Sequence, residues 1–403
     1  MNEGDLIKPT AEAGARMRFD SIDLLRGLVM VIMALDHVRD FFHHALFTHP
    51  PIDPVDLRHT TPVLFFTRWI THFCAPTFVF LAGTGAFLYG TRAKGNGRLS
   101  WFLLTRGLWL VLLDVTLVRL GWNFHLDYSK EFGGGVIWAI GWSMVVMSGL
   151  VFLPTAAIAV LGVALVAFHN LLDGLKAEQV HLPEFLWMVL HSPDRLTIIP
   201  EITIGSFTVP EIRFVTGYSL LPWLGVMASG YGFGALFLLD RHERRKQLLG
   251  LGIALCLLFV FLRASNLYGD QVPSGPEAKA HVGSFPGPWA VQKDYRFTLL
   301  SFLNCQKYPP SLLFLLMTLG PSITFLGLFD RQAGVIGHFF ITFGRVPLFF
   351  YLLHIPLIHG FMVAADSFGT APRRTRLRRH GPSAADKCPA ITATACRWFM
   401  RSG

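Results

Sequence analysis

Charged side chains are scarce in this sequence. Only 15% of its 403 residues are Asp, Glu, Lys or Arg, whereas soluble domains carry about 25%. Hydrophobic residues make up 52% of the chain, and 36 residues are Phe. Because so few charged groups cannot cover a folded surface that faces water, the composition predicts that lipid is the main solvent of this protein.

Cysteine is also rare, and the cysteines form no pattern. None of the five belongs to a CxxC pair and their number is odd, so the sequence indicates neither a disulfide framework nor a zinc site. An HExxH motif is absent, and no histidine pairs occupy matched depths on separate predicted helices. We therefore expect no metal and no haem.

Basic residues exceed acidic ones, but they do not form a nucleic-acid surface. The formal net charge is +9, and much of the excess lies in short connections and in the C-terminal tail. No basic domain is interleaved with exposed aromatic residues, which argues against nucleic acid as a partner. Orientation in a membrane explains the same charges.

Apolar runs long enough to cross a bilayer recur along the chain. A spanning helix needs about 20 mostly apolar residues. The sequence therefore predicts an all-α, polytopic integral membrane helical bundle with about 9–10 transmembrane helices, surrounded by the lipid bilayer. The predicted spans are 22–43, 62–90, 99–118, 133–153, 155–169, 214–239, 247–263, 311–329 and 336–364. The second and the last are long enough to be tilted or broken.

The pattern divides the chain into an N-terminal segment over 1–20, a transmembrane domain over 21–365 and a tail over 366–403. The N-terminal segment is polar and has no cleavage-site pattern, so we expect the first span to be retained. Basic residues of this segment, of 92–98 and of 241–246 fall on one side of the membrane by span count. The positive-inside rule predicts that this side, with the N-terminus, is cytoplasmic.

Ionisable residues near the outer end of the first predicted span are the main functional signal. Such residues are costly at membrane depth and by default mark function, and His is the side chain best suited to act as a base near neutral pH. At 3.6 residues per turn, one helix face carries His37, Asp40 and His44. A second face carries Asp36, Asp40 and His43. Either set offers a carboxylate that orients an imidazole; the alternative is a polar helix end at the membrane interface.

Three further histidines within predicted spans are candidates for a role in the site. His72 occurs about ten residues into the second span, where both a catalytic role and an interhelical hydrogen bond fit the sequence. His354 and His359 are separated by five positions on the last span, so they face different directions. We expect one of this pair to line a site and the other to pack.

Two segments carry a resemblance to a known family. They read RFDSIDLLRGLVMVIMALDHVRDFF and TPVLFFTRWITHFCAPTFVFLAGTGAFLYG, with a later match at FGRVPLFFYLLHIPLIH. Together they resemble the heparan-α-glucosaminide N-acetyltransferase catalytic-domain family, in particular its bacterial branch. The resemblance extends from about 18 to 365 and implies a multi-helix membrane acyltransferase. Such an enzyme takes an acetyl group from cytosolic acetyl-CoA and passes it to a sugar on the other side of the membrane, here a bacterial inner membrane.

The resemblance also suggests roles for individual residues. The family's Asp-x-x-Arg-Gly motif matches Asp23, Arg26 and Gly27. The family's functional Asn falls on or beside His37, and its catalytic His corresponds to His43, His44 or His49. We expect His44 or His43 to be the general base, Asp40 or Asp36 to orient it, and His37 to bind the thioester or the acceptor.

Arginines on the predicted cytoplasmic side suit the phosphates of CoA, because the guanidinium binds phosphate oxygens in pairs. The candidates are Arg26, Arg92, Arg98, Arg106 and Arg345. For Arg92 and Arg98, the alternative is that they only anchor the chain in the membrane.

The tail differs from the rest of the chain. It is poor in apolar residues and carries an arginine cluster over 373–379, on the side where the positive-inside rule disfavours it. We expect either a shifted reading frame that replaces lost spans and inactivates the chain, or a miscounted span that makes the tail cytoplasmic, and we favour the first. Its composition predicts that it is unpacked.

Our first hypothesis is an integral membrane acyltransferase that uses acetyl-CoA and an extracytoplasmic glycan acceptor. The rival is a proton-coupled transporter of a small polar solute, in which the His and Asp residues relay protons. The sequence contains no internal repeat that favours the rival. Association of the chain into a homo-oligomer is compatible with both hypotheses.

Overall fold

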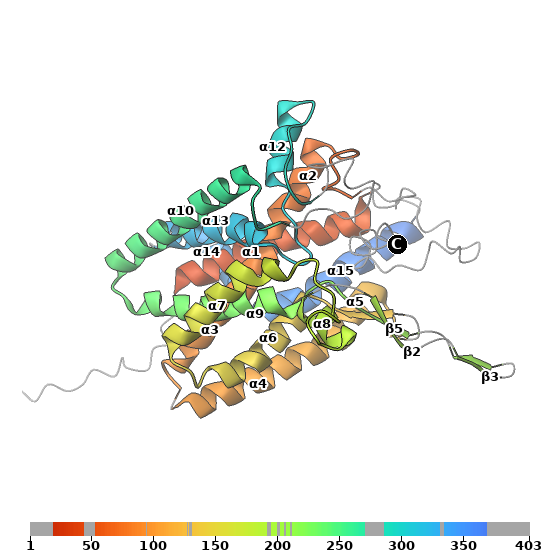
Figure 1. Ribbon diagram of the computed structural model, residues 1–403, viewed down its shortest axis with the longest axis horizontal. Helices are drawn as coiled ribbons and strands as arrows, with labels where there is room; N and C mark the ends of the chain where they lie inside the picture. Colours follow the sequence, from red (N-terminus) through yellow and green to blue (C-terminus); the bar gives the residue numbers. More distant parts are fainter. Residues whose placement is uncertain are drawn as a thin grey trace, which may run out of the picture.

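Long apolar helices account for most of the described chain (Figure 1). The computed structural model describes residues 19–43, 53–93, 95–126, 128, 131–191, 195–199, 202–204, 207–209, 212–270, 286–330 and 334–368. Within them, seven helical stretches are long and apolar enough to cross a membrane. These are Pro62–Gly90, Asn96–Asn123, Thr155–Leu172, Leu220–Leu238, Arg241–Ser265, Leu312–Phe329 and Pro347–Ser367. The prediction of an all-α membrane bundle is confirmed.

The first helix, α1 (Asp20–Phe42), is continuous over 23 residues, but several ionisable side chains interrupt its apolar sequence. Two apolar helices, α6 (Val136–Leu150) and α14 (Val335–Gly344), are shorter than a full span. The remaining main helices are α2 (Pro62–Trp69), α3 (Cys74–Gly90), α4 (Asn96–Leu113), α5 (Arg119–Asn123), α7 (Thr155–Phe168), α8 (Glu184–Leu190), α9 (Leu220–Phe233), α10 (Arg241–Ser265), α12 (Tyr295–Leu303), α13 (Leu312–Phe329) and α15 (Pro347–Ser367).

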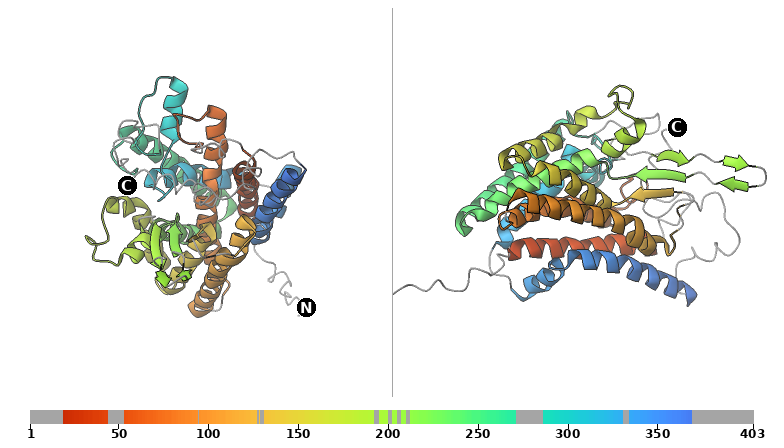
Figure 2. Two further views of the ribbon diagram at one scale, coloured as in Figure 1. Left: turned by 90° about the vertical axis from the view of Figure 1, so that its right-hand side faces the viewer. Right: turned by 90° about the horizontal axis from the view of Figure 1, so that it is seen from below.

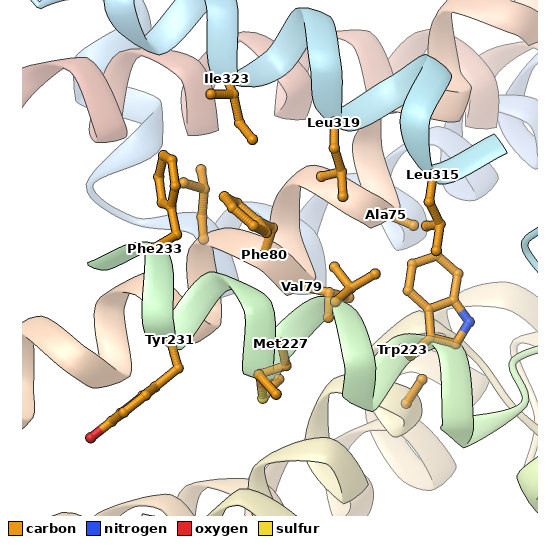
Figure 3. Close-up of a cluster of buried hydrophobic side chains, with 14 of the residues drawn as sticks. Ala75, Val79, Phe80, Trp223, Met227, Tyr231, Phe233, Leu315, Leu319 and Ile323 are labelled. Atoms are coloured by element: carbon orange, nitrogen blue, oxygen red, sulfur yellow. The ribbon is translucent and has the colours of Figure 1, made fainter. Parts of the chain in front are cut away.

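The centre of the bundle lies between α3, α9 and α13. Figure 3 shows side chains from these three helices meeting in one apolar cluster, among them Phe80, Met227 and Leu319. Gly83 and Gly230 let α3 and α9 approach each other so closely that an added Cβ at either position would lie within 2.1 Å of a backbone oxygen. Around this centre, α10 packs on α13, α7 packs on α9, and α4 packs on α6.

The second predicted span is broken near its middle. A 3-10 helix, η2 (Ile70–Phe73), separates α2 from α3. Pro76 has no N–H to donate to the carbonyl of His72, and its ring would clash with that carbonyl in a regular α-helix. The sequence thus forces a local change of helix geometry at His72, which projects from η2.

The last predicted span, 336–364, is two helices rather than one. Gly344 ends α14, and Pro347 occupies the first turn of α15. Val346 between them has φ −127° and ψ 47°, outside the helical region, because a residue that precedes proline is disfavoured in the α conformation. α15 then continues to Ser367, two residues beyond the predicted boundary at 365. Residues 1–18 and the tail from 369 lie outside the described residues.

Two other predicted spans begin with strands. β1 (Glu131–Gly134), β5 (Ile212–Thr216) and β2 (Arg195–Ile199) form a sheet in the order β1-β5-β2, parallel for the first pair and antiparallel for the second. β3 (Ile202–Ile204) and β4 (Phe207–Val209) form an antiparallel pair. Figure 2 shows the strands beyond the helix ends. The predicted starts at 133 and 214 were therefore wrong, because extended segments in the connections pair with one another before the helices begin.

Most basic segments named above meet at one end of the bundle, which we call the arginine-rich end. Arg244 at the start of α10 binds Asp330 after α13, with Nε 2.9 Å from Oδ2, and its guanidinium lies 5.1 Å from the ring centre of Phe19. Phe87, near the end of α3, packs against Tyr231 of α9 with ring centres 5.4 Å apart. The start of α1, the end of α3, the α9–α10 connection and the end of α13 therefore lie together.

The opposite end, which we call the loop end, is organised by one buried arginine. Arg263 is fully buried, and its guanidinium binds Asp270. It also donates to backbone oxygens of Gly287 at 2.9 Å, Ser301 at 2.9 Å and Phe302 at 2.8 Å. A single side chain thus joins the end of α10 to the long segment that contains α12.

Two glycines at the α1–α14 crossing predict a large effect of adding a methyl group. A Cβ at Gly27 would lie 1.8 Å from the backbone oxygen of Phe340, and one at Gly344 would lie 1.7 Å from that of Asp23. Because both obstacles are backbone atoms, α14 must move away from α1 in Gly27→Ala. We expect the free energy of unfolding to fall by about 3 kcal/mol, measured by thermal unfolding of the detergent-solubilised protein.

The matched control for this change is Gly85→Ala in α3, where an added Cβ meets nothing within 4 Å. That variant should unfold within about 0.5 kcal/mol of the wild type. Equal stability of the two variants would show that the α1–α14 crossing is not tight.

Candidate functional site

A pair of histidines forms the centre of the site. His37 of α1 and His354 of α15 lie with Nδ1 and Nε2 2.6 Å apart and with their rings stacked at 4.8 Å. His354 is buried, whereas His37 is partly exposed and lies edge-on to the ring of Trp122 at 5.0 Å. At 1.5 Å per residue, His37 lies about 26 Å along α1 from Asp20, in the half of the bundle near the loop end.

The hydrogen bonds of this pair define which nitrogens carry protons. Nδ1 of His354 lies 2.9 Å from the backbone oxygen of Phe350. A carbonyl oxygen only accepts, so this nitrogen carries the hydrogen, and in a neutral ring Nε2 is then an acceptor. Nδ1 of His37 must therefore donate to it, which leaves the lone pair on Nε2 of His37. Among the described residues, no side chain or backbone group binds that Nε2.

Next to His37, a buried ion-pair cluster joins α1 to α2. Nη1 of Arg68 lies 2.5 Å from Oδ2 of Asp36, and Arg39 pairs with Asp36 one turn along the same helix. Arg39 also binds Asp40, with Nη2 2.9 Å from Oδ1. Arg39, Arg68 and Asp36 are all less than 9% exposed. Breaking such a pair is far more costly than the pair's net stabilisation, because it leaves an uncompensated charge in a low-dielectric interior.

The cluster changes the expected grouping of the site residues. Both carboxylates, Asp36 and Asp40, hold arginines, and the partner that fixes His37 is a second histidine from α15. His43 ends α1, with its backbone N–H bonded to the oxygen of Arg39. His44 and His49 lie outside the described residues. The roles assigned to His43 and His44 stay predictions.

His72 lies in the same part of the bundle and has an unused buried nitrogen. It is 3% exposed, packs against Phe314 with ring centres 5.4 Å apart, and interacts electrostatically with Lys307, Arg68 and Asp36. Its Nδ1 has no hydrogen-bond partner among the described residues. Buried polar atoms are rarely left in this state, so this nitrogen is a candidate contact for a ligand.

Sequence analysis did not find a third element of the site, the loop that precedes α13. Lys307 in this loop interacts with Asp36, and its ammonium lies 5.2 Å from the ring centre of Tyr308. Burial by itself raises the pKa of Tyr308, but the positive charges of Lys307 and Arg68 outweigh it and lower the pKa below the usual value. Neither residue belongs to a recognisable motif, and only the folding of the chain brings them to the site, where Tyr308 also packs against Tyr218 before α9 with ring centres 5.5 Å apart.

The second histidine of α15, His359, packs against other aromatic rings. His359 has Nδ1 3.0 Å from the backbone oxygen of Gly121, and its ring is stacked on Phe41 at 4.8 Å and on Phe124 at 3.9 Å. These contacts fix α5 against α1 and α15.

The candidate phosphate-binding arginines fall into two groups. Arg26 binds Asp23 at 3.2 Å, and Arg345 lies 3.6 Å from Asp20 and 3.9 Å from Asp23. Motif residues of α1 thus meet Arg345, which follows α14, at the arginine-rich end. Arg92 is exposed on the α3–α4 connection, Arg98 is exposed in the first turn of α4, and Arg106 is exposed further along α4, 5.1 Å from the ring centre of Phe102.

Comparison with known families matches residues 18–263 to the family described as heparan-alpha-glucosaminide N-acetyltransferase, catalytic. This match covers more than half of the 403 residues. The chain belongs to this family. A comparison with curated proteins found no match. Membership in the N-acetyltransferase family indicates a membrane acetyltransferase, in agreement with the apolar helices.

The match to the N-acetyltransferase family includes His37, the Asp36–Arg68 cluster and His72, but it ends before α12. His354 and Lys307 therefore come from a part of the chain outside the match. Within the described residues, no group of three or more His, Cys, Asp or Glu side chains is arranged to hold a metal ion.

Proposed function

We propose that this protein transfers an acetyl group from acetyl-CoA to a hydroxyl or amine of an extracytoplasmic carbohydrate, with His37 as the general base. The observation that carries the proposal is the His37–His354 pair, which leaves Nε2 of His37 as an acceptor without a partner in the described part of the chain. A general base needs such an unoccupied nitrogen within reach of the proton it removes.

The reaction would proceed by direct transfer. The acceptor oxygen or nitrogen attacks the thioester carbon while its proton passes to Nε2 of His37, and a new C–O or C–N bond forms. The C–S bond then breaks, and the proton returns from His37 to the sulfur, which leaves as the thiol of CoA. His354 is a positioning residue here, since its Nε2 accepts from Nδ1 of His37 and holds the ring in the required tautomer.

The donor would enter from the arginine-rich end. Arg26 and Arg345 lie there around Asp23, Arg92 is exposed on the α3–α4 connection, and Arg98 is exposed in the first turn of α4. Guanidinium groups bind the phosphates of CoA well. The pantetheine arm with its acetyl thioester would then extend along α1 toward His37. His37 lies about 17 Å from Arg26 along the helix axis, a distance that an extended pantetheine arm can span.

This arrangement requires a defined orientation. The arginine-rich end, with the N-terminus, would face the cytosol, where acetyl-CoA is available, and the loop end would face the opposite side, in a bacterial inner membrane. The same orientation is the one that the positive-inside rule favours. In this proposal the transmembrane domain over 21–365 contains the complete site and the tail over 366–403 has no catalytic role, so the chain is active, in contrast to the inactive chain expected from a shifted reading frame.

The deciding experiment uses the full chain in sealed proteoliposomes with radiolabelled acetyl-CoA on one side and a panel of envelope glycans on the other. We expect label to reach a glycan only when donor and acceptor are on opposite sides. Absence of transfer to every glycan, with the protein folded, would contradict the proposal. Uptake of a small polar solute driven by a proton gradient, without acetyl transfer, would favour the transporter hypothesis instead.

A further inference from the structure

Lys307 is a cation whose position the proposed chemistry does not yet explain. It is partly buried and interacts electrostatically with Asp36, His72 and Cys74, all of which lie inside the bundle. No carboxylate of the described residues lies within 4 Å of its ammonium. Its ammonium interacts with the side chain of the neighbouring Tyr308, but a partly buried lysine without a carboxylate partner is still a candidate for an anionic ligand.

The carboxylates nearby are already committed to arginines. Asp36 binds both Arg39 and Arg68, and Asp40 binds Arg39. Asp53 interacts with Arg68 only at longer range. Lys307 is therefore the cation of this region that has the weakest interaction with these carboxylates.

His72 supplies a second, independent observation. Its Nδ1 is buried without a hydrogen-bond partner among the described residues, and Lys307 is the charged group that acts on it most strongly. Arg68 acts on His72 as well. It uses Nη1 to bind Asp36, and its guanidinium has further N–H groups. Three potential donors, from η2, α2 and the loop before α13, thus interact electrostatically with one another or with Asp36.

The ion-pair cluster that includes Arg68 is also next to His37, because Asp36 precedes His37 on α1. The charged groups that act most strongly on His37 are His354, Asp36, Arg68 and Arg39, and Lys307 is not among them. Asp36 interacts electrostatically with both His37 and Lys307, so its ion pair with Arg68 lies near both groups. A ligand that contacts both must extend past this ion pair, with its anionic group at Lys307 and its reacting group at His37.

The loop that carries Lys307 is held in place from several directions. Gln306 donates its backbone N–H to Asp270 at 3.1 Å, Pro310 accepts from Nε2 of His169 at 2.8 Å, and Asn304 donates to the oxygen of Val55 at 2.8 Å. A loop fixed in this way offers a preorganised ligand contact, which lowers the entropy lost on binding.

We propose that Lys307, His72 and Arg68 form a subsite for a carboxylate or phosphate group on the acceptor. This inference rests on the proposed acetyl transfer and narrows its acceptor to an anionic carbohydrate, such as a uronic acid or a sugar phosphate. The anionic group sets the orientation of the acceptor, so that one particular hydroxyl or amine reaches His37.

The test uses three acceptors that differ only at C6, namely glucose, glucuronic acid and glucose 6-phosphate. Calorimetric titration of the detergent-solubilised full chain with each should detect binding of one or both anions and weaker binding of glucose. Lys307→Met should weaken anion binding roughly ten- to a hundred-fold, because one charge-assisted contact is lost. Lys307→Arg, which keeps the positive charge, should recover part of the lost affinity for the anion.

The matched control is Lys293→Met, which removes an exposed lysine before α12 and should leave the affinity unchanged. In transfer assays, Lys307→Met should raise KM for the anionic acceptor without changing KM for acetyl-CoA. Glucuronic acid and glucose 6-phosphate then distinguish a carboxylate subsite from a phosphate subsite.

Two outcomes would overturn the subsite. One is that the wild type binds neither anion, and the other is that wild type and Lys307→Met bind the anions equally well. Either result would rule out the subsite even if acetyl transfer to neutral glycans is found. Anion binding that depends on Lys307, without any acetyl transfer, would support the subsite and count against the proposed function instead.

Discussion

His37→Gln should reduce acetyl transfer by about a hundredfold to ten-thousandfold while the protein stays folded. The glutamine amide can still donate to Nε2 of His354, which lies 2.6 Å from Nδ1 of His37 in the wild type, but it cannot take a proton from an attacking hydroxyl or amine. Loss of a general base typically has an effect of this size. The measurement is the initial rate of label transfer from acetyl-CoA at saturating donor.

The control for this variant is His242→Gln, which changes an exposed histidine at the start of α10, at the arginine-rich end. It should leave the rate unchanged. The same assay on His43→Gln and His44→Gln decides between our assignment and the sequence-based one. Loss of transfer in His43→Gln or His44→Gln, with a normal rate in His37→Gln, would move the base to the end of α1.

Replacing Arg263 with Met should lower the free energy of unfolding by about 3–5 kcal/mol. The guanidinium is fully buried and binds Asp270 together with three backbone carbonyl oxygens at 2.8–2.9 Å. Its removal leaves the Asp270 carboxylate without its cation in a site where burial already raises the pKa of that group. Thermal unfolding of the detergent-solubilised protein measures the loss.

A double variant separates the unpaired charge from the lost hydrogen bonds. Asp270→Asn in the Arg263→Met background removes the negative charge and should restore part of the lost stability. Arg296→Met, which changes an exposed arginine of α12 that lies over Tyr295, should have an effect below about 0.5 kcal/mol. If Arg263→Met unfolds at the same temperature as Arg296→Met, the contacts of Arg263 do not stabilise the loop end.

The helical bundle could be predicted from the sequence because lipid restricts backbone conformation so severely. Apolar runs of about 20 residues leave few alternatives to a spanning helix, and most predicted spans match helices within a few residues. The break at Pro347 and the 3-10 turn at His72 also have local causes, since proline removes a donor and restricts the residue before it. Strands such as β1 and β5 depend on pairing between distant segments, which a local pattern does not contain.

Only some residues of the candidate site could be predicted from the sequence. The run that contains Asp36, His37 and Asp40 stands out because ionisable residues are rare in an apolar span, and His354 could be named as one of two possible site residues. Helical periodicity, however, pairs residues only along one helix, so it grouped His37 with Asp40. The contact of His37 with His354 joins positions 317 residues apart, and that of Arg68 with Asp36 joins positions 32 apart.

The amino-acid sequence was enough to predict a membrane-embedded helical bundle with basic residues on one side and a polar cluster near the end of the first span. Those features follow from hydropathy and charge, which act locally along the chain. Which side chains meet, in contrast, depends on how the helices pack. The tertiary structure placed His354 beside His37, assigned Asp36 to two arginines and brought Lys307 to His72, because these contacts depend on how α1, α2, α15 and the loop before α13 pack against one another.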